Sequence, residues 1–228
     1  MLTPNDSVSV VIPALNEAEA LPGNLQALLA DDTIQEVIVV DGGSTDGTVG
    51  LVADTPGVKL LHSQAGRGRQ MNTGARAANG DWLLFHHADT RLPMHAGALL
   101  AALDQSVRWG GFRHRFSDAN WKLNLISRLH NYRCRQTGVI YGDQSMFVRR
   151  NFFFKAGAFP EAGLEDLMFS DAALTLAPSM LLDAEVITDS RKFRQIGEVR
   201  ALAHVLSIIR RYEKNKQLDN ERFFQNYR

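Results

Sequence analysis

The amino-acid sequence predicts an α/β protein with a Rossmann-like, mostly parallel central sheet flanked by helices. Strand-like apolar runs alternate with helix-like stretches through the first half of the chain, which is the order of repeated βαβ units. With 228 residues, of which 45% are hydrophobic and 22% charged, the chain is long enough to bury a full core. We expect a single domain over residues 1–228, because no linker, repeat or low-complexity tract divides the sequence.

Four strands and three crossover helices are expected in the first half. Short runs of β-branched and aromatic residues predict strands at 8–12, 36–40, 58–61 and 82–85. Apolar spacing and small residues predict helices at 21–30, 45–53 and 70–79. Ligands of such sheets bind beyond the carboxyl ends of the strands. The polar residues that follow each strand are therefore the first candidates for function.

The second half is less regular and predicts a smaller mixed region. Strands are expected at 110–116 and 144–148, and helices at 121–133 and 164–176. The segment 180–187 is expected to hold two short strands. A final helix is expected at 197–214, with its apolar residues on one face.

The charge balance argues against a general nucleic-acid binder, because Lys and Arg total 25 and Asp and Glu also total 25. Cys134 is the only cysteine, so no intrachain disulfide is expected. No signal peptide or membrane-spanning run is visible in the sequence. These features predict a cytoplasmic protein. The basic helix and tail at 193–228 leave peripheral contact with the inner face of a membrane as an alternative to packing on the sheet.

Polar residues gather in the loops after the first two strands. The first loop contains Asn16 and Glu17, and the second contains Asp-Gly-Gly-Ser-Thr-Asp-Gly-Thr from Asp41 onward. Glycine lets the backbone approach a ligand, and the start of the next helix offers free amide groups to an anion. Asp41 ends an apolar strand, where a ligand is expected, whereas Asp46 is interpreted as a helix-start carboxylate.

Two further loops carry groups suited to phosphate and to metal. The segment Gly-Arg-Gly-Arg at 66–69 places two guanidinium groups at a helix start, which suits a diphosphate, with a solvated basic turn as the alternative. His87 and Asp89 follow the fourth strand and point to the same side of an extended backbone. They offer a nitrogen and a carboxylate to Mn²⁺ or Mg²⁺. His86 is interpreted as a residue that fills space, which is also the alternative to metal binding for His87.

The ordered series of these motifs resembles the family-2 glycosyltransferases of the GT-A fold, in particular small bacterial members whose acceptors are undefined. Tyr-Gly-Asp-Gln at 141–144 and Leu-Glu-Asp at 164–166 are similar to the family's acceptor-side loop and Glu-Asp motif. The resemblance covers residues 7–192. It implies a nucleotide-sugar-binding half at about 7–90 and a smaller mixed acceptor and catalytic half at about 91–192.

The resemblance also implies roles for individual residues on the donor side. Pro13, Leu15 and Glu17 would line the nucleoside pocket, and Asp41 would accept a hydrogen bond from the base, uracil in the simplest case. Further nucleotide contacts are implied for Gly43, Arg67, Gln70, Asn72 and Ala88. Asp89 matches the final aspartate of the family's Asp-x-Asp metal motif, with His87 in place of the first. Gly42 replaces a second aspartate that is common in the strand-two loop.

On the acceptor side, Asp166 matches the general base of an inverting hexosyl transfer from a nucleotide-diphosphate sugar, most simply a UDP-sugar, to an acceptor hydroxyl. Glu165 precedes this base, and Asp143 is the second candidate. All three residues also fit a helix start or a turn. A nucleotidyltransferase acting on a sugar phosphate, and a nucleotide-sugar-binding module without activity, remain alternatives. The acceptor, whether carbohydrate, lipid or small molecule, is not fixed by the sequence.

Overall fold

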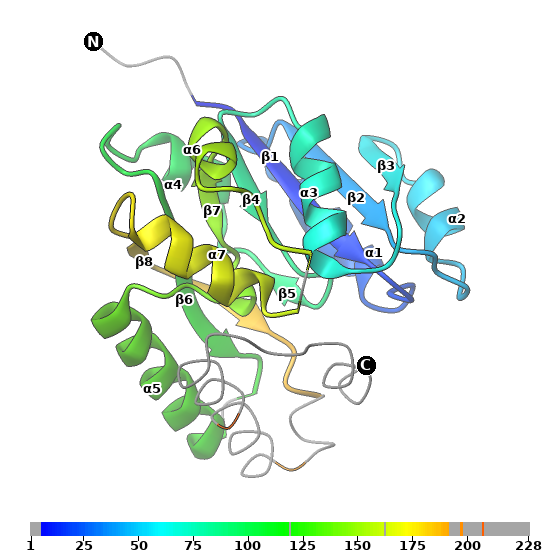
Figure 1. Ribbon diagram of the computed structural model, residues 1–228. Coiled ribbons are helices and arrows are strands. Elements are labelled where there is room, and N and C mark those ends of the chain that lie inside the picture. Colours follow the sequence, from blue (N-terminus) through cyan, green and yellow to red (C-terminus); the bar gives the residue numbers. More distant parts are fainter. Residues whose placement is uncertain (1–5, 119, 162, 192–196, 198–206, 208–228) are drawn as a thin grey trace.

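A computed structural model describes residues 6–118, 120–161, 163–191, 197 and 207. Their backbone forms an eight-stranded sheet in the order β3-β2-β1-β4-β7-β6-β8-β5, with helices on both faces (Figure 1). The elements are, in chain order, β1 (Val8–Ala14), α1 (Leu21–Leu29), β2 (Glu36–Asp41), α2 (Thr48–Ala53), β3 (Val58–His62), α3 (Arg67–Ala77), β4 (Trp82–Phe85), β5 (Thr90–Arg91), α4 (Ala96–Ala101), β6 (Trp109–Phe116), α5 (Trp121–Thr137), η1 (Gly142–Gln144), β7 (Phe147–Arg149), α6 (Arg150–Lys155), α7 (Glu165–Leu174) and β8 (Met180–Thr188).

The parallel half of the sheet follows the prediction closely. β1 pairs in parallel with both β2 and β4, so that Val10 lies opposite Val37 on one side and Leu84 on the other. β3 pairs in parallel with β2. These strands are apolar because helices cover both of their faces. Three helices start at or near the predicted positions, although α2 starts at Thr48 and α3 already at Arg67.

Two hydrophobic clusters lie on opposite faces of the sheet. One contains alternate residues of β1 and β2 together with buried side chains of α1, α2 and α4. The other contains Val11, Ile38 and Val40 with buried side chains of α3, α6 and α7. Successive strand residues point to opposite faces. This double cover holds the carboxyl ends of β1, β2 and β4 at one rigid edge.

The second half is a mixed extension of the same sheet. β7 pairs antiparallel to both β4 and β6, and β6 pairs in parallel with β8. The expectation of two short strands at 180–187 is wrong, because Met180–Thr188 is one strand. Its register against β6 shifts between Phe112 and Arg113, where Leu182 and Glu185 are the successive partners. The irregular pattern in the sequence therefore reflects a bulge and not a strand break.

Several other expectations change in the structure. Gln144 belongs to the short 3₁₀ helix η1, and the strand expected at 144–148 is confined to Phe147–Arg149. The elements β5, α4 and α6 were not predicted. None exceeds six residues, so none is long enough to show the periodic spacing of apolar residues that indicates a helix or a strand. The helix expected at 197–214 and the basic tail lie outside the described residues. Among the helices that are described, none combines the length and the apolarity needed to cross a bilayer.

Candidate functional site

The loops after β1 and β2 meet at the amino-terminal turn of α3. The side-chain amide of Gln70, on α3, donates hydrogen bonds of 2.8 Å to the carbonyls of both Ala14 and Val40. A Cβ atom at Gly42 would lie only 3.0 Å from that amide. The glycine at position 42 is thus explained by the buried glutamine beside it. Gln70 ties the ends of both strands to the helix that carries Arg67.

Asp41 orders the loop that follows β2. Its carboxylate accepts hydrogen bonds from the amides of Gly43 at 2.8 Å and Ser44 at 3.2 Å. Burial alone would raise the pKa of Asp41, but the hydrogen bonds from Ser44 and Gly43 and the nearby His62 lower it below its usual range. Asp41 is therefore a buried anion at the tip of β2, as the sequence predicts; its contact with a base stays a prediction.

Side chains cross-link the first two loops. The Ser44 hydroxyl accepts from the Asn16 amide at 2.9 Å, and Asn16 accepts from the Thr45 amide at 2.8 Å. Asp46 accepts hydrogen bonds from the amide of Thr48, at the start of α2, and from the amide of Ala18. The interpretation of Asp46 as a helix-start carboxylate is thereby confirmed. Pro13, Leu15 and Glu17 lie half-buried in this prearranged segment.

The loop after β4 is held by α1. Asn24 donates to the carbonyls of His87 at 3.0 Å and Ala88 at 3.1 Å. His86 is fully buried between the Ser145 hydroxyl, at 2.8 Å, and the Asn24 side-chain oxygen, at 3.2 Å. The interpretation of His86 as a packing residue is confirmed. The hydrogen bonds from Asn24 therefore fix the backbone that carries His87 and Asp89.

A second group of side chains meets around Gly142. The Gly142 amide donates a 2.7 Å hydrogen bond to Oδ2 of Asp166, and the Leu167 amide donates to Oδ1 at 2.8 Å. A Cβ atom on Gly142 would lie 2.9 Å from Nε2 of His87 and 3.5 Å from the Asp166 carboxylate. The Arg67 guanidinium lies 3.4 Å from Nδ1 of His87. α3, the β4 loop, η1 and α7 therefore each supply one group to the same place.

Burial sets the protonation of these groups. It lowers the pKa of His87 to about 3, with the Arg67 charge acting in the same direction, so the imidazole is neutral at pH 7. Burial also raises the pKa of Glu165 to about 7, assisted by the neighbouring Asp166, and raises the pKa of Asp166. Arg67 counteracts both increases. Asp166 is thus more basic than an ordinary carboxylate while its two oxygens are fixed by backbone amides.

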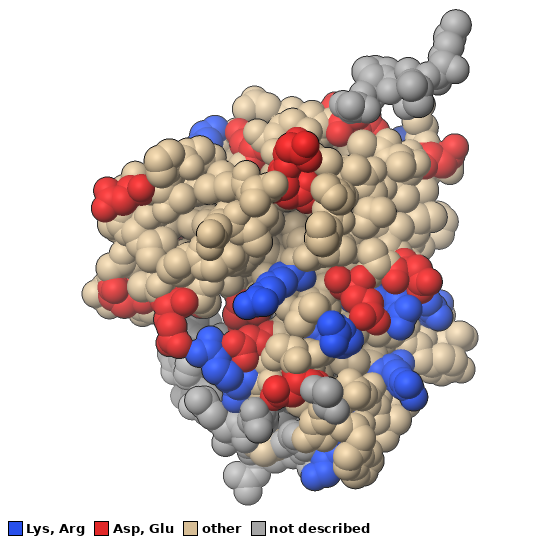
Figure 2. All heavy atoms as spheres, turned by 180° about the vertical axis from the view of Figure 1, so that it is seen from behind, with Lys and Arg blue, Asp and Glu red and all other residues tan. Residues whose placement is uncertain are grey.

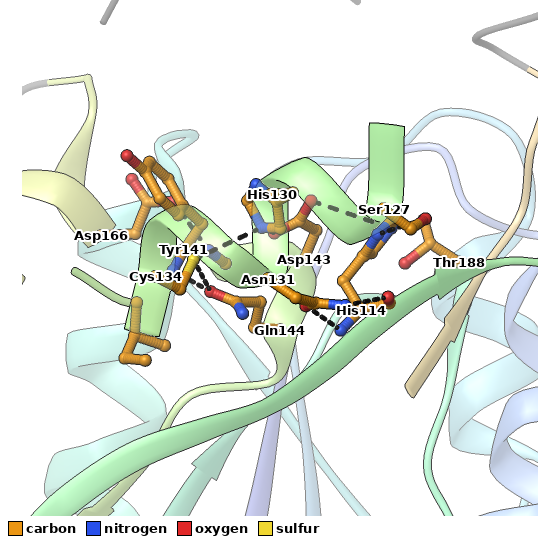
Figure 3. A network of polar contacts seen from close by, with 12 residues as sticks. His114, Ser127, His130, Asn131, Cys134, Tyr141, Asp143, Gln144, Asp166 and Thr188 are labelled. Carbon is orange, nitrogen blue, oxygen red and sulfur yellow. Dashed lines mark hydrogen bonds and ion pairs between the residues drawn. The ribbon is translucent and has the colours of Figure 1, made fainter. Parts of the chain in front are cut away.

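Asp143 lies in a different environment, between two histidines (Figure 3). His130 Nε2 lies 3.4 Å from one carboxylate oxygen, and His114 Nε2 lies 3.9 Å from the other. Burial would raise the pKa of Asp143, but the two histidines hold it below the usual range. Burial would lower the pKa of His130, yet Asp143 raises it to about 10. Asp143 is therefore a stable anion opposite an imidazolium, which makes it a weaker proton acceptor than Asp166.

Polar side chains fix η1, the turn between Tyr141 and Ser145. Gln144 accepts hydrogen bonds from the Tyr141 amide at 3.0 Å and from the Cys134 thiol at 3.2 Å. The Tyr141 ring packs 5.1 Å from His130 and 5.4 Å from the Arg133 guanidinium, measured between centres. The Tyr141 hydroxyl is buried and has no hydrogen-bond partner in the described part of the chain. A buried hydroxyl without a partner marks a position where a ligand atom would be favourable.

The comparison with protein families matches residues 9–161 to glycosyl transferase family 2. The chain belongs to this family. The matched segment contains every predicted donor-side residue and ends shortly before Glu165 and Asp166.

Curated relatives of the chain are glycosyltransferases as well. A PGL/p-HBAD biosynthesis glycosyltransferase of Mycobacterium bovis is 38% identical over 174 residues, which are 71% of this chain and 64% of the relative. An undecaprenyl-phosphate 4-deoxy-4-formamido-L-arabinose transferase of Aeromonas hydrophila is 32% identical over 155 residues, 62% of this chain. That match spans 48% of the relative, so the chain covers about half of its length.

Solved structures identify the fold as GT-A. TarS from S. aureus (residues 1–349) superposes with a TM-score of 0.65 at 20% identity, over 87% of this chain and 65% of that one. The mannosyltransferase PcManGT from Pyrobaculum calidifontis also gives 0.65, at 21% identity, over 97% and 68%. The family-2 chain thus has the predicted sheet with a mixed extension beside it.

Several site residues of this family-2 chain were not recognised from the sequence. His114 lies on β6 and His130 on α5, and no motif connects them to Asp143. Tyr141 lay inside a recognised motif, but its buried hydroxyl could not be foreseen. Two predicted nucleotide contacts, Gln70 and Asn72, use their side-chain amides on the protein itself; Asn72 exchanges hydrogen bonds of 2.8 and 3.0 Å with the backbone of Phe159. Their contact with a nucleotide stays a prediction.

We expect Gly142→Ala to disable the site while the fold survives. The added methyl group would enter the His87 ring and separate His87 from Asp166, at a stability cost of about 1–3 kcal/mol. Misplacement on this scale lowers turnover roughly hundredfold. Gly50→Ala on α2 is the matched control, because its Cβ would meet nothing within 4 Å. Equal activity of the two variants, measured with thermal unfolding, would contradict this geometry.

The His130 and Asp143 pair predicts a specific pH dependence. Asp143→Asn should lower the pKa of His130 by roughly 1 to 3, as observed by NMR titration of the ring protons. The folded-state pKa of His130, about 10, lies above its ordinary value of 6.5. The stabilisation is therefore present below pH 6.5 and is lost as the pH rises through 10.

The loss of unfolding free energy caused by Asp143→Asn should accordingly be larger at pH 6 than at pH 10. Asp183→Asn removes an exposed carboxylate that pairs with Arg113 at 3.0 Å, and it should leave the His130 titration unchanged. An unaltered His130 titration in Asp143→Asn would show that the two groups are not paired.

Proposed function

We propose that the protein transfers a hexosyl group from a nucleotide-diphosphate sugar to an acceptor oxygen, with inversion at the anomeric carbon. One observation carries this proposal. The Asp166 carboxylate is half-buried, has a raised pKa and is oriented by two amides, and it lies beside Arg67 and His87 on one side and η1 on the other. This is the arrangement needed for a general base placed between a diphosphate and an acceptor.

The donor side is supported by the prearranged loops. The strand tips that carry Asp41 are fixed through Gln70, and Arg67 begins the helix beside them. A guanidinium and free helix amides suit a diphosphate. TarS has been solved in complex with UDP and with UDP-GlcNAc, and PcManGT in complex with GDP-Man and Mn²⁺. We retain UDP-sugar as the proposed donor, with Asp41 as the acceptor of a hydrogen bond from the base.

A divalent cation fits His87 and Asp89. The low pKa of His87 keeps the imidazole neutral, so that one ring nitrogen has the lone pair that ligates a metal, and the Asp89 charge acts on the same ring. With a neutral imidazole and one carboxylate as ligands, the other coordination positions of the ion would be filled by phosphate oxygens and water, which suits Mn²⁺ or Mg²⁺. When bound, such an ion would neutralise negative charge on the leaving diphosphate.

In the proposed reaction, an acceptor oxygen attacks the anomeric carbon while Asp166 takes its proton. The bond between that carbon and the β-phosphate oxygen breaks, and the nucleoside diphosphate leaves with the electron pair beside Arg67. Glu165, with a pKa of about 7, exchanges protons easily near neutral pH and tunes the charge of Asp166. The Tyr141 hydroxyl has no hydrogen-bond partner among the described residues. In this proposal it lies on the acceptor side and would hydrogen bond to the incoming acceptor.

Asp166→Asn is expected to remove transfer and to leave nucleotide binding intact. A positioned base contributes about 10²- to 10⁴-fold to the rate. The measurement is release of UDP from a panel of UDP-sugars, together with the UDP-induced rise in melting temperature in the presence of Mn²⁺. Asp54→Asn, an exposed carboxylate at the end of α2, is the control.

Three results would count against this assignment. Pyrophosphate as the product would indicate a nucleotidyltransferase. Binding of UDP by the unaltered protein without transfer of any sugar would indicate a binding module. Loss of transfer in Asp143→Asn, with full activity in Asp166→Asn, would give the role of base to Asp143.

A further inference from the structure

Helix α5 exposes a row of large apolar side chains on its outer surface. Trp121, Leu125, Leu129 and Tyr132 are 71%, 48%, 54% and 64% exposed. Their spacing of four, four and three residues places them within one narrow stripe, since each residue turns the helix by about 100°. The stripe runs from the first residue of the 17-residue helix to Tyr132, over about two thirds of its length. A contiguous apolar surface of this kind marks an interaction site.

Basic residues border this stripe on both sides. By helical geometry, Lys122 and Arg133 lie along one edge, and Arg128 and Arg135 along the other. Arg133 packs over the Tyr141 ring and Arg135 pairs with Asp183 at 3.2 Å, so Lys122 and Arg128 are the charges most directed at a partner. α5 contains no aspartate or glutamate. Seen from behind in Figure 2, acidic and basic side chains lie close together over the middle of the molecule, in keeping with the equal totals of the whole chain.

The other face of α5 is firmly attached to the protein. Leu123, Ser127, Asn131 and Cys134 are buried. Asn131 exchanges hydrogen bonds of 2.8 and 2.9 Å with the backbone of His114 on β6, and the Asn120 side chain caps the first turn. The inner face therefore satisfies the packing of the helix, and among the described residues the outer stripe takes no part in the core.

We propose that the outer face of α5 docks on an anionic membrane surface. An interfacial helix places Trp and Leu at the boundary of headgroups and acyl chains, while Lys and Arg beside them contact lipid phosphates. Charge complementarity selects this occupant. A second copy of the same face would oppose basic residues with basic residues, and the chain beyond Asp189 has ten Lys and Arg against four Asp and Glu. Anionic lipid offers the opposite sign.

Docking in this way would bring the acceptor side to the bilayer. α5 carries the stripe outside and His130 inside, and His130 pairs with Asp143 and packs on the Tyr141 ring. In Figure 1, α5 lies at the opposite end of the molecule from α2 and β3. A lipid-linked acceptor would then reach η1 directly; this last step rests on the proposed function, whereas the docking itself does not.

The chain contains a built-in probe of this contact. Trp82 and Trp109 are fully buried, whereas Trp121 is the exposed tryptophan of the three. Mixing the full-length protein with vesicles of phosphatidylcholine and phosphatidylglycerol should shift its emission to shorter wavelength, and brominated acyl chains should quench it. Pure phosphatidylcholine vesicles should give a much weaker response. Trp121→Phe should abolish the spectral response while co-flotation persists.

Two variants test the face itself. Lys122→Gln with Arg128→Gln should weaken flotation with anionic vesicles by roughly thirtyfold, given about fivefold for each charge near the surface. Leu125→Ser with Leu129→Ser should abolish it. Both pairs are exposed, so circular dichroism melting should confirm folding. Met94→Ser with Leu176→Ser removes exposed apolar residues elsewhere, 83% and 48% exposed, and should bind like the unaltered protein.

Flotation that is unaffected by both α5 variants, or absent in the unaltered protein, would overturn the proposal. So would a dimer in light scattering that the Leu125→Ser, Leu129→Ser variant converts to a monomer, because the face would then join two copies. Loss of sugar transfer in Asp166→Asn with intact flotation would leave the docking proposal standing, so the two proposals fail separately.

Discussion

The close approach of the His87 ring to the Gly142 backbone joins the two parts of the candidate site. On one side of this contact lie His87 and Arg67, which belong to the parallel half of the sheet. On the other side lie η1 and α7 of the mixed extension, which are linked by the hydrogen bond from the Gly142 amide to Asp166. Only a glycine allows the His87 ring to approach this backbone. The position of the loops after β1, β2 and β4 relative to Asp166 thus depends on one close contact between backbone and side chain.

Desolvation and the neighbouring charges together set the pKa of each ionisable group in this region. Three carboxylates, those of buried Glu165 and half-buried Asp143 and Asp166, are partly desolvated near two cations, Arg67 and the imidazolium of His130. Asp143 receives the closer counter-charge and remains an anion. Asp166 receives backbone amides and a shared guanidinium, and its pKa is raised. The same residue type therefore forms an ion pair at position 143, whereas at position 166 it has the raised pKa that the proposed role of proton acceptor requires.

The sequence predicted the parallel half of the fold well because those strands are buried on both faces and read as continuous apolar runs. The rule that ligands bind at the carboxyl ends of strands then singled out Asp41, Arg67, His87 and Asp89. The prediction failed where elements are short, as at α4 and α6, and at the bulge in β8. It also missed His114 and His130, since their contact with Asp143 arises from the pairing of α5 and β6, which no local pattern encodes.

The central claim is that these separate loops surround one nucleotide diphosphate and its cation. NMR spectra of the ¹⁵N-labelled protein with UDP, recorded with Mn²⁺ in place of Mg²⁺, test it most directly. Paramagnetic broadening should be strongest for the amide signals of Gly43, Gly68, Ala88, Gly142 and Leu167. Broadening centred on the exposed cluster of Asp31, Asp32 and His95, whose ligand atoms lie within 4.8 Å of one another, or on no amide at all, would contradict the account.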